Sequence, residues 1–304
     1  MTHRILIIDQ DQSSNEHLRG LLHPRYEVVV APTLNEARAL LSQHEISLVL
    51  GDFEFFKEWD PNFPFEIPLL RPKAKLALIS RSDTDHYLPF LLEWHCFHVL
   101  PKLPFYNVSE VFLFLENILY PFRAFGLSRY LAGDAECRNL RIANRVDKNR
   151  TVAEIINFFA GCEYEIHELY DVRLIMEEGI NNAIFHAFVD EEGKPKYRSE
   201  DFHSLDSSDE VWLEFGADAT TVGFCITDNR GSLKPEEIVQ KMSRQYNREG
   251  LYDESGRGLY LARLLSANMI FNIEKGKRTQ VINLFHEKRL NIPHPFSINI
   301  IEQQ

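Results

Sequence analysis

Three polar residues recur at intervals of four along one predicted helix. Glu178, Asn182 and His186 lie within residues 171–188, where apolar side chains recur at i, i+3 and i+4, as in a helix with one face in a core. Residues four apart share a helix face, so the three form a polar row beside the apolar stripe. The amide oxygen of Asn182 could bind Mg²⁺, and the Glu178 carboxylate could orient or deprotonate a nucleophile. Taken alone, such a row would also fit the solvated edge of a helix.

A second group of residues lies further along the chain and could bind a nucleotide. Asp228 follows a predicted strand over residues 221–226, where its carboxylate could accept a hydrogen bond from an exocyclic amine such as that of adenine. Residues 256–259, Gly-Arg-Gly-Leu, open a predicted helix whose free N–H groups could hold phosphates. On its own this glycine motif would more simply be a tight turn. Its place after the polar row and the acid favours a site that acts by positioning and electrostatics.

The order of these motifs resembles the ATP-binding domain shared by gyrase, Hsp90, histidine kinases and the MutL repair proteins, the GHKL superfamily. E-x-x-x-N-A-x-x-H, D-x-x-G after a strand, G-R-G-L at a helix start and Lys-Arg-Thr in a late turn follow one another over about residues 135–288. Within that superfamily, the sequence is most similar to the anti-sigma-factor serine kinases. The resemblance implies an α+β two-layer sandwich of the Bergerat type that binds ATP and Mg²⁺.

The same resemblance implies roles for individual residues. In the family, the residue matching Glu178 is the catalytic base and the one matching Asn182 binds Mg²⁺. Asp228 matches the acid that recognises adenine, and Thr279 matches a threonine near the adenine. The residues expected to bind ATP are Asn182, His186, Asp228, Gly231, Gly256, Arg257, Gly258, Leu259 and Thr279.

One motif departs from the family pattern. Where the family has D-x-G-x-G, residues 228–232 read Asp-Asn-Arg-Gly-Ser, so Arg230 and Ser232 replace both glycines. The charged stretch that follows, residues 233–255, is predicted to be a mobile cover over the site. Without these glycines, the hinge of the cover is expected to be less flexible, whereas nucleotide binding is affected less.

Residues 1–120 have a different pattern, in which short apolar strands alternate with helices. The predicted strands cover residues 5–8, 26–31, 46–50, 75–79 and 97–100. This alternation predicts a doubly wound α/β domain with a parallel sheet. Side chains just past the carboxyl ends of such strands gather at one crevice, and here they are Asp9, Asp52, Ser80 and Lys102. The acids could bind a hard cation, while the lysine and the hydroxyl could steady a phosphoryl group on one acid.

This second set of residues resembles the receiver domain of bacterial two-component response regulators. By that resemblance Asp52 accepts a phosphoryl group, and Ser80 and Lys102 match the switch hydroxyl and the lysine of the family. Receivers usually carry two adjacent acids after the first strand, whereas the second position here is Gln10 and Asp11 is displaced by one residue. A receiver that is phosphorylated and a pseudo-receiver that takes no phosphate both remain open.

The patterns also divide the chain along its length. We expect a receiver-like domain, a connector, a GHKL-type ATP-binding domain and a C-terminal tail over residues 1–120, 121–134, 135–290 and 291–304. The second domain is expected to open with a strand over residues 140–146 and a helix over residues 152–160.

Composition limits the classes of partner. The formal net charge of −12 argues against a nucleic-acid surface and against binding to acidic lipid. The four cysteines are scattered without metal-ligand spacing, which is typical of reduced thiols in the cytoplasm. The most lipid-like segment, residues 111–120, is short and contains Glu116, so we expect no membrane span.

Together these features predict a bacterial signalling protein that transfers the γ-phosphoryl group of Mg-ATP to a serine or threonine of a partner, modulated by its receiver-like domain. By resemblance, that partner is a STAS-type anti-anti-sigma protein or a sigma factor, and the family also suggests a homodimer. The altered glycines and Gln10 favour an alternative, a non-catalytic module that sequesters a sigma factor or its antagonist. A histidine kinase without its own acceptor helix is a third reading, because no histidine occurs between His98 and His167.

Overall fold

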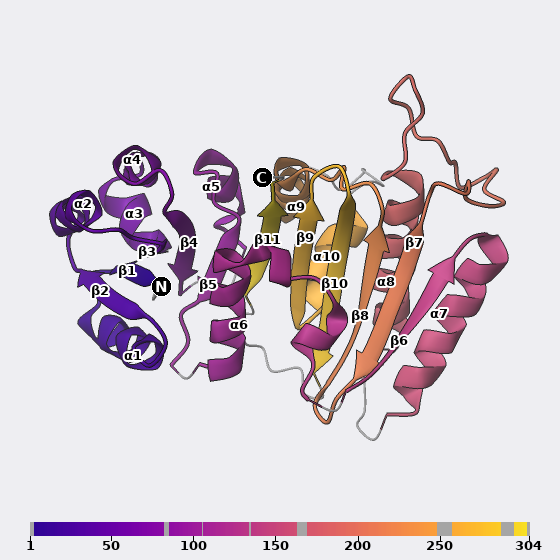
Figure 1. Ribbon diagram of the computed structural model, residues 1–304, viewed down its shortest axis with the longest axis horizontal. Coiled ribbons are helices and arrows are strands. Elements are labelled where there is room, and N and C mark those ends of the chain that lie inside the picture. The colour runs from indigo at the N-terminus through magenta and orange to yellow at the C-terminus, as the bar shows by residue number, and fades with distance from the viewer. Residues whose placement is uncertain are drawn as a thin grey trace. The chain divides into compact units, whose positions relative to one another are not determined.

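The computed structural model describes residues 3–81, 85–104, 106–133, 135–162, 169–247, 257–286 and 295–302. The chain divides into two compact units, one of Met1–Tyr120 with Ile292–Ser297 and one of Pro121–Asn291 with Ile298–Gln304 (Figure 1). Each unit has a hydrophobic core of its own.

The first unit is built from strands that alternate with helices. Its strands are β1 (Arg4–Ile8), β2 (Glu27–Ala31), β3 (Leu48–Asp52), β4 (Lys75–Ser80) and β5 (His98–Pro101), and its helices are α1 (Gln12–Leu22), α2 (Leu34–Gln43), α3 (Phe53–Trp59), α4 (Phe63–Leu70), α5 (Leu88–Glu93) and α6 (Val108–Leu119). The strands run parallel in the order β2-β1-β3-β4-β5. This is the doubly wound order of flavodoxin and CheY, and it confirms the predicted α/β class.

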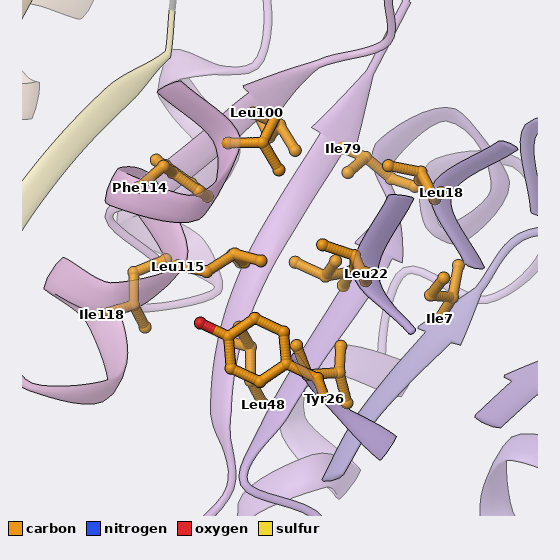
Figure 2. Packing of buried hydrophobic residues seen from close by; sticks show 14 of the residues in the cluster. Ile7, Leu18, Leu22, Tyr26, Leu48, Ile79, Leu100, Phe114, Leu115 and Ile118 are labelled. Carbon is orange, nitrogen blue, oxygen red and sulfur yellow. The ribbon is translucent and has the colours of Figure 1, made fainter. Parts of the chain in front are cut away.

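Apolar side chains of α1 and α6 pack on one face of the parallel strands. Figure 2 shows the helix residues Leu18, Leu22, Phe114, Leu115 and Ile118 against the strand residues Ile7, Leu48, Ile79 and Leu100. Full burial of such a side chain contributes about 1.5–3 kcal/mol relative to leaving it in water. This layer therefore fixes the carboxyl ends of the strands, where Asp9 and Asp52 lie.

The second unit combines antiparallel strands with a layer of helices. Its strands are β6 (Glu136–Ile142), β7 (Val211–Ala217), β8 (Thr221–Asp228), β9 (Asn268–Glu274) and β10 (Arg278–His286), and its helices are α7 (Arg145–Ala160), α8 (Leu169–Phe185), α9 (Pro235–Tyr246) and α10 (Arg257–Leu265). Neighbouring strands pair in the order β6-β7-β8-β10-β9. Helices segregated to one face of an antiparallel sheet define the predicted α+β sandwich.

Strand β8 shows how its alternating side chains serve both faces of this sheet. Ile226 faces α8, where its Cδ1 would lie 2.5 Å from a Cβ placed on Gly179. Its neighbour Cys225 belongs to an apolar cluster on the other face with Leu127 and Leu131. The segment expected to be a connector contains the short 3₁₀ helices η1 (Pro121–Arg123) and η2 (Leu127–Tyr130), and it packs on the sheet through η2 and Leu131.

Two element boundaries in the second unit differ from the expected ones. The predicted strand over residues 140–146 lies earlier, as β6, because Asn144 caps α7 by accepting a hydrogen bond from the Asp147 N–H at 2.9 Å. Thr279, expected in a turn, lies in β10 and pairs with Asp228 of β8.

The segments expected to be a mobile cover and a C-terminal tail both contain regular structure. The charged stretch after Ser232 includes helix α9, whose residues Ile238, Val239 and Met242 are buried on one face. Residues 248–255 of that stretch lie outside the described part of the chain. The expected C-terminal tail contains strand β11 (Phe296–Ile301), whose first residues pair antiparallel with Val99 and His98 of β5.

Candidate functional site

Helix α8 presents the predicted polar row to a cavity in the second unit. Glu178, Asn182 and His186 line this cavity of about 280 Å³, with Gly179 and Ala183 between them. The other lining residues come from α8 and the residues just after it, from β8 and the turn that follows it, from β9 and β10, and from α9 and α10: Ile175, Ala187, Ile226, Asp228, Ser232, Leu233, Glu237, Ile238, Lys241, Gly258, Leu259, Ala262, Met269, Phe271, Thr279, Val281 and Asn283. Residues far apart in sequence thus meet around one space.

Asp228 is the buried acid of this cavity. Its Oδ1 atom accepts hydrogen bonds from the backbone N–H groups of Arg230 at 2.8 Å and Gly231 at 3.2 Å. Burial raises the pKa of the Asp228 carboxyl, and these backbone hydrogen bonds oppose that rise by favouring the ionised form. The turn therefore holds the carboxylate in one orientation through Oδ1.

Thr279 lies beside Asp228 and supplies a second polar group. It is 3% exposed, and its nearby hydroxyl favours the ionised form of Asp228. Yet Oγ1 makes no hydrogen bond of ordinary geometry with any described group. A buried hydroxyl without a partner costs stability unless a ligand or water satisfies it. This orphaned group in the cavity wall fits a nucleotide with polar edges.

Gly231 has a structural role in the turn rather than a place in the cavity wall. Its φ of +59° lies in the left-handed region that glycine adopts without strain. A Cβ there would lie 2.1 Å from the Glu274 carbonyl oxygen. The turn after β8 therefore needs glycine at this position, although Gly231 is absent from the cavity lining.

The Gly-Arg-Gly-Leu motif is only partly described. Gly256 lies outside the described residues, and Arg257 is the first residue of α10. Gly258 and Leu259 line the cavity. Gly258 lies against Glu178, so that the start of α10 and the predicted catalytic carboxylate are direct neighbours.

His186 follows directly after α8 and faces charged groups of α9. Burial lowers its pKa, and the positive charge of Lys241 lowers it further, so both favour the neutral imidazole. Lys241 and Glu237 also line the cavity, and sequence reasoning did not assign them to the site. Glu237 and Lys241 are four residues apart on an amphipathic helix, and this spacing could have indicated that they share one face of it.

In the first unit, Lys102 joins the two predicted acids. Its ammonium lies 2.6 Å from Asp9 Oδ2 and also pairs with Asp52, and all three side chains are buried. Burial raises the pKa of the Asp52 carboxyl, the bond to Lys102 opposes this, and Asp9 adds to the rise. Asp11, which could have stood in for a second acid, instead caps α1 by accepting from the Ser13 N–H at 3.0 Å.

Ser80 lies beside this charged cluster, where its carbonyl accepts from the Lys102 N–H at 2.7 Å, but it donates its hydroxyl to Glu54. The Ser80 Oγ to Glu54 Oε1 distance is 2.8 Å, and Glu54 Oε2 is buried without a partner among the described residues. Sequence reasoning did not predict Glu54. Asp52 caps α3 by accepting a hydrogen bond from the Phe55 N–H at 2.6 Å. Glu54 lies in this first turn of α3, within hydrogen-bonding distance of Ser80.

Magnesium fits the nucleotide cavity through a single protein ligand. A magnesium ion bound with a nucleotide takes most of its ligands from phosphates and water, so the Asn182 amide oxygen suffices. In the described part of the chain, no group of three or more His, Cys, Asp or Glu side chains is placed to hold a metal by itself. Among the described helices, none has both the length and the apolar character needed to cross a membrane.

Residues 142–283 match the family model of the histidine kinase-like ATPase domain. The match lies within the second unit, and the predicted GHKL-type fold is confirmed. A search among curated proteins finds no match for the chain.

Solved structures that are similar over about two fifths of the chain include response regulators and receiver domains. A response regulator from Thermotoga maritima is 19% identical, over 39% of this chain and 98% of that one, with a TM-score of 0.36. A CheY-like receiver domain protein from Methanospirillum hungatei JF-1 is 23% identical over 41% of this chain and 100% of that one, with a TM-score of 0.35. The strand order of the first unit is that of such domains. The first unit thus has the strand order of a receiver domain, and residues 142–283 of the second unit match the histidine kinase-like ATPase family.

Proposed function

We propose that the second unit transfers the γ-phosphoryl group of Mg-ATP to a serine or threonine hydroxyl of a partner protein. One observation carries this proposal: Glu178 and Asn182, on one face of α8, line the same cavity as Asp228 and Thr279. The cavity thereby brings together a carboxylate that can take a proton, an amide oxygen that can bind a cation, and a buried acid that can recognise the adenine base.

The transfer follows from these positions. The partner's hydroxyl oxygen forms a bond to the γ-phosphorus, while the bond between that phosphorus and the β–γ bridging oxygen breaks and ADP leaves with its electron pair. Glu178 accepts the hydroxyl proton. Asp228 accepts a hydrogen bond from the adenine amine, and the N–H groups at the start of α10 face the phosphates. Asn182 would hold Mg²⁺, which would supply positive charge to neutralise the phosphates.

The partner class comes from the resemblance to anti-sigma-factor kinases. A STAS-type anti-anti-sigma protein would be the phosphorylated substrate, and a sigma factor would be a second protein that the domain binds. The receiver-like unit, through Asp52, would modulate the activity. A homodimer of the ATPase domain is part of the same proposal.

A phosphotransfer assay tests the proposal directly. Wild-type protein, γ-labelled ATP and a STAS-type partner should give phosphoserine or phosphothreonine on the partner. Glu178→Gln should abolish labelling and keep nucleotide binding, whereas the control Glu177→Gln should label normally. Glu177 is the neighbouring acid, pairs with Arg173 at 2.8 Å and is not part of the cavity wall. Equal labelling by Glu178→Gln and the wild type would exclude Glu178 as the base.

The second candidate function is non-catalytic sequestration of a sigma factor or its antagonist. The observation that favours it is the turn after β8, where Arg230 and Ser232 make contacts in place of two flexible glycines. A domain with a fixed turn can hold nucleotide and partner without a catalytic cycle. Partner capture that is unaffected by Glu178→Gln, together with no labelling by the wild type, would favour this function.

A further inference from the structure

Asp209 is a buried carboxylate with several partners, in the loop between α8 and β7. The residue has no exposed surface. Its carboxylate accepts hydrogen bonds from Lys196 Nζ and the Tyr197 hydroxyl, both at 2.6 Å, and from Ser208 Oγ at 3.1 Å. The Arg230 guanidinium completes the set by pairing with Oδ1. The group is fully enclosed by donors, which is the arrangement a buried charge requires.

Arg230 connects this buried acid to the acid of the nucleotide cavity. Its guanidinium pairs with Asp209, while its backbone N–H donates to Asp228 Oδ1 at 2.8 Å. The guanidinium also lies over the Phe188 ring, 5.4 Å from its centroid. One residue therefore bonds to both carboxylates, although it replaces a glycine of the family motif.

The neighbours of Arg230 strengthen the same connection. Asn229 Oδ1 accepts from the Glu210 N–H at 3.0 Å, and Asn229 Nδ2 donates to the Ser208 carbonyl at 2.9 Å. On the other side, Ser232 Oγ donates to the Ala187 carbonyl at 3.2 Å. The turn is thus fastened at residues on both sides of Gly231.

The loop that carries Asp209 is itself anchored to the end of α8. Aromatic rings form a chain from Phe185 through Phe202 and Tyr197 to Phe188, with neighbouring centroids 5.7, 5.9 and 5.8 Å apart. Rings at such distances pack favourably in edge-to-face geometry. The loop, the turn and the helix end therefore form one packed group beside the cavity.

We propose that Arg230 and Asp209 are positioning residues for the nucleotide base, which fix the turn after β8 so that Asp228 keeps its orientation toward the cavity. The proposal rests on the nucleotide-binding part of the proposed function and does not depend on phosphoryl transfer. An anchored turn replaces the flexible glycine hinge of related domains. The pair acts through Asp228, so base selection is the property that it controls.

Base selection can be measured with two nucleotides. ATP and GTP share the ribose and triphosphate. ATP presents an exocyclic amine that can donate a hydrogen bond to the ionised Asp228, whereas GTP presents a carbonyl oxygen at that place. In the full-length protein, we expect calorimetry to show that Arg230→Gly and Asp209→Asn lower the ATP-to-GTP affinity ratio about tenfold, the size of one charge-assisted hydrogen bond. Arg230→Lys should restore most of the ratio. The control Arg198→Gly, an exposed arginine of the same loop, should keep it.

Hydrogen exchange of the nucleotide-free protein gives a readout that does not depend on ATP. Backbone amides of residues 228–232 should exchange about tenfold faster in Arg230→Gly and Asp209→Asn than in the wild type or Arg198→Gly. Unchanged exchange at this turn would overturn the proposal, as would an equal loss of ATP and GTP affinity, because a general structural defect weakens both. If the variants change the ATP-to-GTP affinity ratio and the exchange of residues 228–232 as expected, but the wild type labels no partner, the result contradicts the kinase function alone.

Discussion

Glu178 of α8 and Gly258 of α10 approach so closely that no side chain fits between them. A Cβ placed on Gly258 would lie 2.6 Å from Oε2 and 2.9 Å from Cβ of Glu178. Atoms of a real side chain do not come this near, so one of the two helices or the carboxylate would have to move. The glycine therefore sets the position of the carboxylate that we propose as the catalytic base.

Replacing Gly258 by alanine should displace this carboxylate. We expect Gly258→Ala to destabilise the second unit by about 1–3 kcal/mol through overpacking, and to weaken phosphoryl transfer more than ATP binding. Chemical denaturation and the labelling assay measure the two effects. The matched control is Gly20→Ala in α1, where a Cβ meets nothing within 4 Å. That change should stabilise by about 0.5–1 kcal/mol, the helix preference for alanine over glycine. Equal stabilisation by both changes would contradict the close approach of Glu178 and Gly258.

Local patterns predicted the parts of the site that lie on regular elements. The period of α8 brought Glu178, Asn182 and His186 to one face, and the cavity lies along that face. Alternating strands and helices likewise predicted the parallel sheet that gathers Asp9 and Asp52 around Lys102. In each case, a repeat within one segment determines which side chains point the same way.

Features set by long-range pairing could not be predicted in this way. Thr279 was assigned to a turn, because its place opposite Asp228 depends on the register of two strands far apart in sequence. The contact of Arg230 with Asp209 joins a turn to an irregular loop, where no periodicity marks the partner. Sequence identified Arg230 as a departure from the family, and only the fold shows which group it contacts.

The buried hydroxyl of Thr279 predicts different effects of its removal on protein stability and on ATP affinity. Thr279→Val keeps the shape and removes a hydroxyl that lacks a partner among the described residues, so stability should stay constant or rise. ATP affinity should fall about five- to tenfold if the hydroxyl meets the nucleotide or a bridging water. The control Thr221→Val removes a hydroxyl 3.0 Å from His286 Nδ1 in the same unit, so it should lower stability and leave affinity unchanged. Denaturation and calorimetry on both variants decide the matter, and unchanged ATP affinity in Thr279→Val would remove Thr279 from the site.

Asp209 makes the stability of the second unit sensitive to acid. Burial alone would raise the pKa of its carboxyl, but bonds from Lys196, Tyr197 and Arg230 outweigh burial and lower the pKa to about 2. Because the folded-state pKa is depressed, the stabilisation is complete above the unfolded pKa near 4 and is lost as pH falls from about 4 to 2. We expect a loss on the order of 1–2 kcal/mol over this range in the wild type and a flatter profile in Asp209→Asn. Denaturant titrations at successive pH values test this, and parallel profiles would show that Asp209 is not the titrating group.

The buried cluster of Asp9, Asp52 and Lys102 leads to a prediction about phosphorylation of Asp52. Two acids, Asp9 and Asp52, pair with the one ammonium of Lys102, and the Ser80 hydroxyl donates to a third acid, Glu54. A phosphoryl group on Asp52 would add negative charge beside Glu54 and compete for a hydroxyl that this acid already holds. We therefore expect acetyl phosphate and Mg²⁺ to label the wild type poorly, and Glu54→Gln to raise labelling about fivefold.

Matched variants separate this effect of Glu54 from other causes. Glu58→Gln removes an exposed acid from the same helix α3 and should label like the wild type. Asp52→Asn, alone or with Glu54→Gln, should abolish labelling, since Asp52 is the expected acceptor. Intact-mass measurement detects the added phosphoryl group without assuming its position, and peptide analysis then locates it. If the wild type labels as fully as Glu54→Gln, Glu54 is no barrier and the first unit accepts phosphate despite Gln10. If neither labels, the charge cluster of Asp9, Asp52 and Lys102 is structural and the pseudo-receiver interpretation holds.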